Sequence, residues 1–181
     1  MGDPGERPLS LQEWVVLCIA CENPTYGFAI AALLSREGSL GQVWQVSKPA
    51  IYRAIVRLEQ RGLVQATGRE PTNVGPARSL VIATRTGRTA ARRWLRTPVA
   101  HGRDVRSELM IKLALLVRAG DDPQDVLSRQ RAAFGPLAAA LADRVHDTTG
   151  MDRTVALWRH EMMSAITQFL NQAAGMPRPG S

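Results

Sequence analysis

The residues with the most informative chemistry lie in one short segment, from Ser47 to Arg61. Arg53 and Arg57 are four residues apart, which places both guanidinium groups on one face of a helix. A guanidinium group can donate two parallel hydrogen bonds to a phosphate group or to the edge of a guanine base. Ser47 and Lys48 begin the segment, where the free amides and the dipole of a helix favour a phosphate group. These side chains are therefore suited to binding a nucleic acid.

The same segment has the pattern of an amphipathic helix. Apolar residues recur at helical spacing and predict a buried side; they are Ala50, Ile51, Ala54, Ile55 and Leu58. The opposite side carries Lys48, Tyr52, Arg53, Val56, Arg57 and Gln60. Ser47 is a favoured helix cap, Pro49 is tolerated in a first turn, and Gly62 is a good stop. The alternative interpretation is that arginines such as Arg57 and Arg61 only solvate the surface of this helix.

The net charge is concentrated in the same region. The chain of 181 residues has a formal charge of +7 and a pI near 10.6. Residues 47–96 contain 11 basic and 2 acidic side chains, whereas residues 98–181 contain 10 and 9. One basic region of this kind is expected where a single face of a protein meets a polyanion. The alternative is a solvated basic surface, as is common in arginine-rich proteomes.

The elements around this helix follow from turn residues and apolar periodicity. A first helix begins near Ser10 and ends at Asn23-Pro24, and its apolar residues cover more than one side, so it needs two packing partners. The other elements predicted before residue 97 are a helix over 26–35, strands over 63–67 and 79–83, and a helix from about 84 to 96. The loop Gly68–Arg78 between the strands is rich in turn residues and predicts a β-hairpin with a basic tip.

The remainder of the chain is predicted to be helical over 105–118, 121–145 and 152–173, and Gly135-Pro136 is expected to kink or split the second of these helices. The last helix carries a long apolar stripe that a small domain could not cover alone. The stripe consists of Val155, Trp158, Met162, Ile166 and Phe169. We therefore expect this helix to join two copies of the chain; the alternative is a helix that packs only within its own monomer.

The order helix, helix, turn, helix, basic hairpin, helix is that of a winged helix-turn-helix. Over about residues 9–173 the chain resembles the PadR-like transcriptional regulators. The stretches that carry the resemblance are Leu9-Ser10-Leu11-Gln12-Glu13, Tyr26-Gly27-Phe28-Ala29-Ile30, Trp44 to Tyr52, Leu58 to Val64, Gly75-Pro76-Ala77-Arg78, Thr84-Arg85-Thr86-Gly87, Trp94-Leu95 and Arg106-Ser107-Glu108-Leu109. The chain departs from the family pattern at several positions, Gly135-Pro136 among them, because this pair interrupts what is commonly a longer helix. Arg53 stands where a proline is usual, and Val81-Ile82-Ala83-Thr84 lacks the usual aromatic residue.

The resemblance implies a mainly α fold with a small β-hairpin wing: a winged helix-turn-helix DNA-binding domain over 9–97, then an α-helical dimerisation domain over 104–174. It also implies a homodimeric repressor that binds double-stranded DNA at a palindromic operator and is released by a small-molecule effector. The third helix would lie in the major groove. The expected DNA-binding residues are Ser47, Lys48, Tyr52, Arg53, Arg57 and, at the wing, Arg69 and Arg78. The expected dimerisation residues are Trp14 and the stripe on the last helix.

Two further groups of residues invite a ligand-binding interpretation. Trp14, Trp94 and Trp158 are candidates to line a pocket for the phenolic or drug-like effectors that the resemblance suggests, although core packing is the preferred interpretation of each. Cys18 and Cys21 have the spacing of a metal or redox site. No second pair of ligands accompanies them, so buried thiols are favoured, and we expect neither a metal nor a cofactor.

Several classes of protein are not expected. The sequence shows no nucleophile–base pair, no phosphate-binding loop and no paired carboxylates, so it does not predict an enzyme. No apolar run reaches the roughly 18 residues of a membrane-spanning helix. The lack of a signal sequence and the small number of cysteines indicate a cytoplasmic protein. Two other functions stay open: a sequence-independent DNA-binding or nucleoid-associated protein, and a protein-interaction module without DNA binding.

Overall fold

Two compact units make up the chain, residues 1–95 and residues 96–181, and each is described by itself. The computed structural model describes residues 7–70 and 78–175, except for the side chains of residues 68–70 and 78. The functional division predicted from the sequence, 9–97 and 104–174, stays a prediction.

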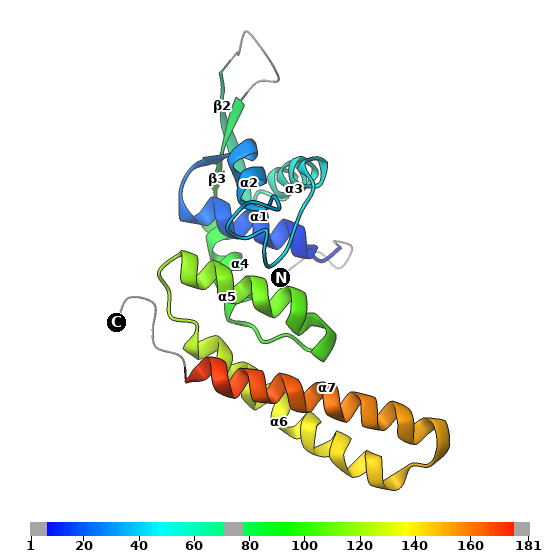
Figure 1. Ribbon diagram of the computed structural model, residues 1–181. Coiled ribbons are helices and arrows are strands. Elements are labelled where there is room, and N and C mark those ends of the chain that lie inside the picture. The colour runs from blue at the N-terminus through cyan, green and yellow to red at the C-terminus, as the bar shows by residue number, and fades with distance from the viewer. Residues whose placement is uncertain (1–6, 71–77, 176–181) are drawn as a thin grey trace. The chain divides into compact units, whose positions relative to one another are not determined.

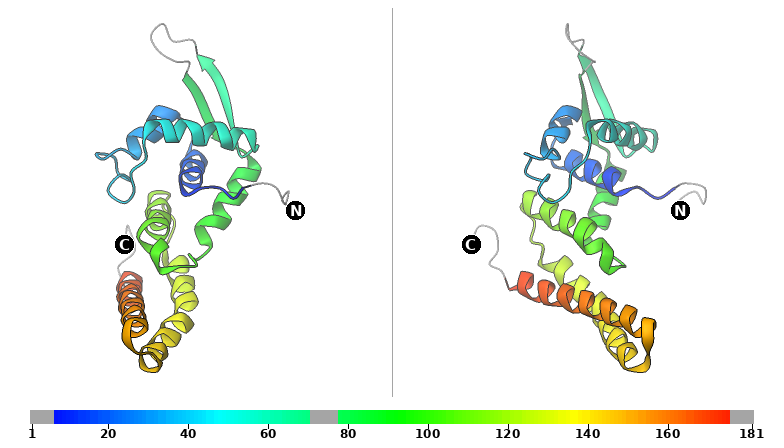
Figure 2. Two further views of the ribbon diagram at one scale, coloured as in Figure 1. Left: turned by 90° about the vertical axis from the view of Figure 1, so that its right-hand side faces the viewer. Right: turned by 45° about the vertical axis from the view of Figure 1, so that its right-hand side comes forward.

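The first unit combines helices with a small antiparallel sheet (Figure 1). Its described helices are α1 (Leu11–Glu22), α2 (Gly27–Leu33), α3 (Lys48–Gln60) and α4 (Arg85–Arg96). Its described strands are β1 (Thr25–Tyr26), β2 (Val64–Glu70) and β3 (Arg78–Ala83), in the order β1-β3-β2. Strands β2 and β3 form a hairpin that extends past the helices of this unit (Figure 2). The predicted mainly helical fold with a small hairpin wing is thereby confirmed.

Strand β1 was not expected from the sequence. It is only two residues long, and Thr25 pairs with Val81 while Tyr26 pairs with Leu80. A run this short has no alternation that a pattern could reveal. The helix expected over 26–35 therefore begins one residue later, at Gly27, because Tyr26 is extended and belongs to the sheet.

Helices α1 and α3 form the centre of the first unit. Residues 15–20 of α1 are all buried, as expected for a helix that is apolar on more than one side. Helix α3 packs against α1 and completely buries Ile51 and Leu58. The position and direction of α3 are therefore determined by its aliphatic side, which leaves the opposite side in solvent.

Hydrogen bonds attach α4 to its neighbours in the first unit. Thr84 Oγ1 accepts a hydrogen bond from the Gly87 amide at 3.0 Å, which caps the helix, and donates one to the Gly62 carbonyl at 2.8 Å. Arg88 donates to the Cys21 carbonyl at 2.8 Å, near the end of α1 where carbonyl groups lack helical partners. A Cβ atom on Gly87 would collide with the Leu63 carbonyl, so this close approach requires glycine.

The second unit is helical throughout its described elements. They are a 3₁₀ turn (Gly102–Asp104), a π-helical turn (Val105–Leu109), α5 (Met110–Arg118), α6 (Gln124–Asp147) and α7 (Gly150–Ala174). Helices α6 and α7 pack against each other as an antiparallel pair (Figure 1). Ala156, Met163 and Leu170 of α7 are buried at intervals of seven residues, the spacing of a helix–helix seam. None of the described helices is both long and apolar enough to span a membrane.

Helix α6 is continuous through Pro136, so Gly135-Pro136 does not split it, contrary to one of the expected outcomes. A residue before proline normally avoids the helical conformation because its Cβ and amide clash with the proline ring. Gly135 has no Cβ, and this lowers the cost of continuing the helix.

Two buried polar side chains hold the first residues of the second unit. Gln130 of α6 is completely buried; its amide accepts a hydrogen bond from the Val99 amide at 2.8 Å and donates one to the Val99 carbonyl at 3.0 Å. Lys112 of α5 is only 1% exposed and lies 2.6 Å from the Glu108 carboxylate. It also donates to the Thr97 carbonyl at 2.8 Å. These bonds compensate the cost of burying an amide and an ammonium group.

Candidate nucleic-acid interface

Helix α3 begins and ends at the residues that its sequence predicts. Ser47 occupies the cap position in an extended conformation, but its hydroxyl makes no capping hydrogen bond, so only its backbone serves the helix. Gly62 ends the helix with φ +64°, a left-handed conformation that favours glycine. All five residues predicted for the inner side are buried. The remaining side chains consequently lie on an outer side in solvent.

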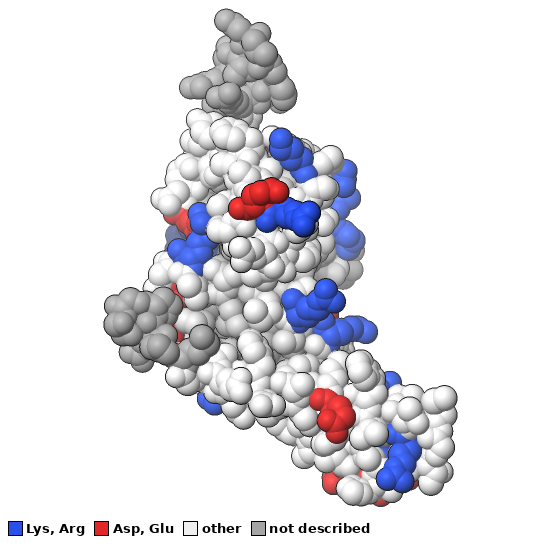
Figure 3. Space-filling view, in the orientation of Figure 1, with Lys and Arg blue, Asp and Glu red and all other residues white. Residues whose placement is uncertain are grey.

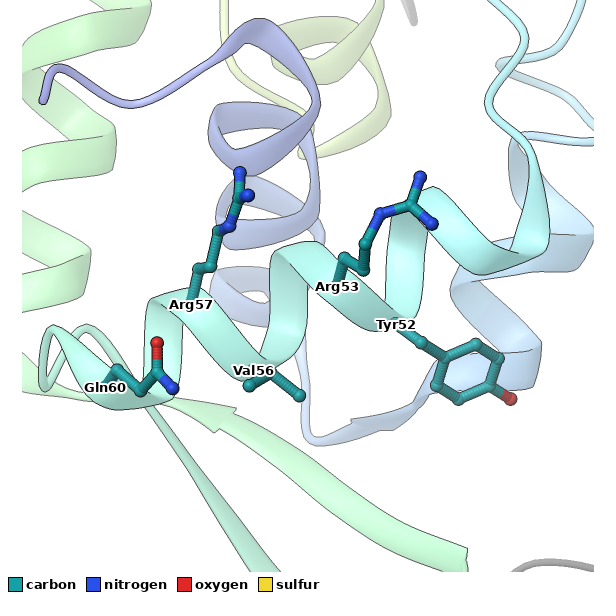
Figure 4. A pocket seen from close by; sticks show the side chains of 5 residues that line it. All are labelled: Tyr52, Arg53, Val56, Arg57 and Gln60. Carbon is teal, nitrogen blue, oxygen red and sulfur yellow. The ribbon is translucent and has the colours of Figure 1, made fainter.

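The outer side of α3 forms an open groove of about 380 Å³ (Figure 4). The residues that line it are Tyr52, Arg53, Val56, Arg57 and Gln60. The structure thus brings together three of the predicted DNA-binding residues. Val56 and Gln60 were placed on this side by the helical pattern but were assigned no role. Val56 is 51% exposed, as its place on the outer side predicts.

Arg53 and Arg57 extend to the same side of α3 (Figure 4). Arg53 is exposed and has no hydrogen-bond or ion-pair partner among the residues that the structure describes. Arg57 reaches α1, where its Nη1 atom donates a hydrogen bond to Glu13 Oε1 at 3.3 Å, although half of its side chain stays exposed. One arginine is therefore free to turn towards a ligand, whereas the other is held at one end by the protein.

The carboxylate of Glu13, which accepts the hydrogen bond from Arg57, is buried, with only 3% of its side chain exposed. Its Oε2 atom accepts a hydrogen bond from the Ser10 amide at 2.7 Å, and Arg7 lies 3.2 Å from Oε1. Burial raises the pKa of this carboxyl, but the hydrogen bonds from Ser10 and Arg57 and the charge of Arg7 outweigh burial, so the pKa is lowered overall. Glu13 is consequently a stable anion that can hold Arg57.

The Tyr52 ring lies against the start of α2. A Cβ atom on Gly27 would be 2.8 Å from Tyr52 Cε1 and 3.2 Å from Ile55 Cδ1, so the ring occupies the space that a side chain at position 27 would need. Tyr52 is nevertheless 48% exposed. Its ring is thus packed on one side while the residue stays accessible, as expected for a tyrosine that donates to a phosphate group.

The start of α3 is also accessible, since Ser47 and Lys48 are both exposed. Lysine and arginine side chains are visible over the part of the first unit where α3 lies in Figure 1 (Figure 3). The backbone of Arg69 lies in β2 and that of Arg78 lies in β3, where Arg78 pairs with Glu70, the residue after Arg69. Their side chains, and the wing tip at residues 71–77, lie outside the described part of the chain.

The expected dimerisation residues are distributed over both units. Trp14 of α1 stacks on Trp94 of α4 within the first unit, with ring centroids 5.4 Å apart. On α7, Trp158 is 68% exposed and Val155 is 41% exposed. The rest of the stripe, Met162, Ile166 and Phe169, is half-buried. The stripe is therefore most accessible near the start of α7.

The two cysteines of α1 are free thiols, with Cys18 buried and Cys21 half-buried. Burial raises the pKa of the Cys21 thiol, although the nearby Arg88 and Arg92 oppose this effect. A raised pKa disfavours the thiolate form that reacts or binds metal. Among the described residues no group of three or more His, Cys, Asp or Glu side chains could hold a metal ion.

Comparison with known proteins finds a matching family model and several solved structures that are similar to this chain. Residues 16–93 match the model of the "Transcriptional regulator PadR-like family". No curated protein sequence matches the chain. Bacillus subtilis PadR in complex with operator DNA has a TM-score of 0.48 and 14% identity, with 93% of this chain and 100% of that chain covered. The same protein with p-coumaric acid has a TM-score of 0.44 and 15% identity, over 92% and 98% of the two chains. The protein smu.1604c of Streptococcus mutans UA159 has a TM-score of 0.43 and 12% identity, over 91% and 98%.

Proposed function

Residues 16–93 make this chain a member of the PadR-like family of transcriptional regulators, and on that premise we propose that it is a homodimeric repressor that binds an operator through α3. The prediction that the chain is not an enzyme is confirmed by this membership, since the family is one of non-enzymatic regulators. Because such a repressor would act on DNA inside the cell, the proposal includes the cytoplasmic location that the sequence predicts.

The observation that carries the proposal is the two-sided nature of α3. Its aliphatic side is buried, while Lys48, Tyr52 and Arg53 stand on accessible positions with cationic or hydrogen-bonding groups. A helix presented in this way fits the major groove of B-DNA, where arginine can form two hydrogen bonds to a guanine. The first turn of the helix and Lys48 would bind phosphate groups and set the position of the helix. The wing residues Arg69 and Arg78 would contact the adjacent backbone or minor groove.

The exposed start of the α7 stripe supports the homodimer. Large apolar side chains that project into water, such as Trp158 and Val155, are expected where a second protein surface covers them. A two-fold dimer would place two α3 helices about 34 Å apart, one turn of B-DNA, and would therefore prefer a palindromic site. We assign the stripe, together with Trp14, to contacts between the two copies. Residues 9–97 would thus bind DNA and residues 104–174 would dimerise.

Regulation by a small molecule is part of the proposal because the family resemblance implies it. Titrating phenolic acids into the operator complex is the direct measurement, and release of the DNA is the expected result. Retention of DNA at millimolar concentrations of every phenolic acid tried would remove this class of effector and leave DNA binding untouched.

The experiment that tests the main claim compares binding to DNA from upstream of the protein's own gene with binding to scrambled DNA of the same length, at physiological salt. A specific regulator should prefer its operator by about 10³-fold or more. Equal affinities would support the sequence-independent alternative and overturn the repressor. A complete lack of DNA binding would leave the protein-interaction module.

A further inference from the structure

An aliphatic side chain lies at the middle of the surface that α3 offers to DNA. Val56 is 51% exposed and lines the groove between Tyr52 and Gln60 (Figure 4). Each step of four residues turns about 40° around a helix, and one step of a single residue turns about 100°. Viewed along α3, Val56 therefore lies between Tyr52 and Arg53. It is central to the outer side and does not belong to the border of the buried side.

The neighbours of Val56 on this side can all form hydrogen bonds. Arg53 and Gln60 have the groups that recognise guanine and adenine in the major groove, and Arg57 is held by Glu13. A valine side chain can neither donate nor accept a hydrogen bond. The one apolar group on the major-groove edges of the four base pairs is the C5-methyl group of thymine. A valine in this position thus has one chemically matched partner.

We propose that Val56 recognises the methyl group of a thymine in each half of the operator. The proposal rests on the proposed function, because it requires α3 to enter the major groove. Arg53 and Gln60 are seven residues apart, a distance of about 10 Å along the helix axis. This corresponds to roughly three base-pair steps of about 3.4 Å. The thymine therefore lies within the few base pairs that the side chains of Arg53 and Gln60 reach.

The test uses a change in DNA that removes only the methyl group. An operator is selected from random DNA with the full-length protein, and each thymine is then replaced in turn by deoxyuridine, which pairs in the same way. Loss of one methyl contact corresponds to about 0.8 kcal/mol, or about a four-fold loss of affinity for each half-site. We expect this loss at one thymine in each half-site and little change at the others.

The variant Val56→Ala identifies the side chain that detects the methyl group. Because Val56 is half-exposed on a helix, alanine should leave the fold intact, as circular dichroism will verify. Val56→Ala should bind the thymine and deoxyuridine operators equally. The control is Val117→Ala on α5, a valine that is 43% exposed, and it should keep the wild-type sensitivity.

The possible outcomes separate this assignment from the proposed function. Wild-type protein that prefers its operator over scrambled DNA but is indifferent to deoxyuridine at every thymine overturns the role of Val56 alone. Sensitivity that persists in Val56→Ala overturns it as well, since another side chain then contacts the methyl group. Equal binding to operator and scrambled DNA removes the proposed function and the thymine contact together.

Discussion

Glu13 of α1 and Arg57 of α3 are 44 positions apart in the sequence, and Arg57 Nη1 donates a hydrogen bond to Glu13 Oε1 at 3.3 Å. The same carboxylate accepts the Ser10 amide at the start of α1. One buried anion therefore links the beginning of the first helix to an arginine on the outer side of the third. This bond restricts Arg57 to the side of α3 next to α1.

We predict that Glu13→Gln lowers the free energy of unfolding by about 1–2 kcal/mol at neutral pH, the range for loss of a helix-capping contact and a charge-assisted hydrogen bond. The pKa of Glu13 is lowered in the folded protein from its ordinary value of 4.5. Its stabilisation is therefore present above pH 4.5 and is lost as the pH falls through the folded-state pKa. Urea denaturation of both proteins between pH 7 and pH 3 measures the difference.

The exposed Glu37 supplies the matched control, since Glu37→Gln should leave stability unchanged over the same pH range. A difference between wild type and Glu13→Gln that stays constant down to pH 3 would contradict the prediction. Such a result would mean that the charge of Glu13 does not contribute and that the amide disturbs packing instead.

We also predict different effects for Arg53 and Lys48, two of the exposed cations of α3. Arg53→Ala should cost about 1–3 kcal/mol on the operator and relax the preference at one base position. Lys48→Ala should weaken operator and scrambled DNA about equally and reduce the dependence of log affinity on log salt by about one unit. Fluorescence anisotropy at several salt concentrations distinguishes the two. The exposed Arg131 of α6 provides the control, and equal losses on both DNAs for Arg53→Ala would refute its role in reading sequence.

The inner and outer sides of α3 were predictable because they depend on local spacing. The buried residues recur every three or four positions, and the cap and stop residues lie at both ends of the helix. Arg53 and Lys48 are accessible, as the spacing predicts. Contacts between distant segments were not predictable in this way. Glu13 stands three residues after Ser10, the spacing of a helix-capping pair, but nothing local indicates that it binds Arg57.

The distinction between local spacing and contacts of distant segments also explains where else the structure differs from the sequence predictions. Strand β1 exists because Thr25 and Tyr26 meet the edge of β3, and a two-residue strand has no pattern of its own. The continuity of α6 depends on the absence of a Cβ atom at Gly135, a steric detail that a general rule about Pro136 omits. Helical spacing did place Val56 on the outer side of α3, where it is 51% exposed, but the pattern alone assigned this apolar side chain no role.

A further prediction concerns the space that Gly27 leaves for the Tyr52 ring. The variant Gly27→Ala should push the tyrosine ring aside, because the new Cβ would lie 2.8 Å from Cε1 in its present position. The ring can move into solvent at little cost, so the melting temperature should change little while affinity for the operator falls about three- to ten-fold, the loss of about one hydrogen bond. In a Tyr52→Ala background, Gly27→Ala should have no further effect on DNA binding. Additive losses would show that Gly27 acts through another group.

Finally, we predict that Trp158→Asp dissociates the proposed homodimer. Trp158 is 68% exposed in the single chain, so a charged residue there should leave the monomer folded. In a dimer interface the same carboxylate would be buried without a partner, which costs about 2 kcal/mol or more. Analytical ultracentrifugation should therefore show a monomer at concentrations where the wild type is a dimer, and operator affinity should fall in parallel. Leu157→Asp is the matched control, since Leu157 is 45% exposed but projects about 100° around α7 from Trp158. If Trp158→Asp stays dimeric, or if both variants dissociate equally, the two copies do not meet through this stripe.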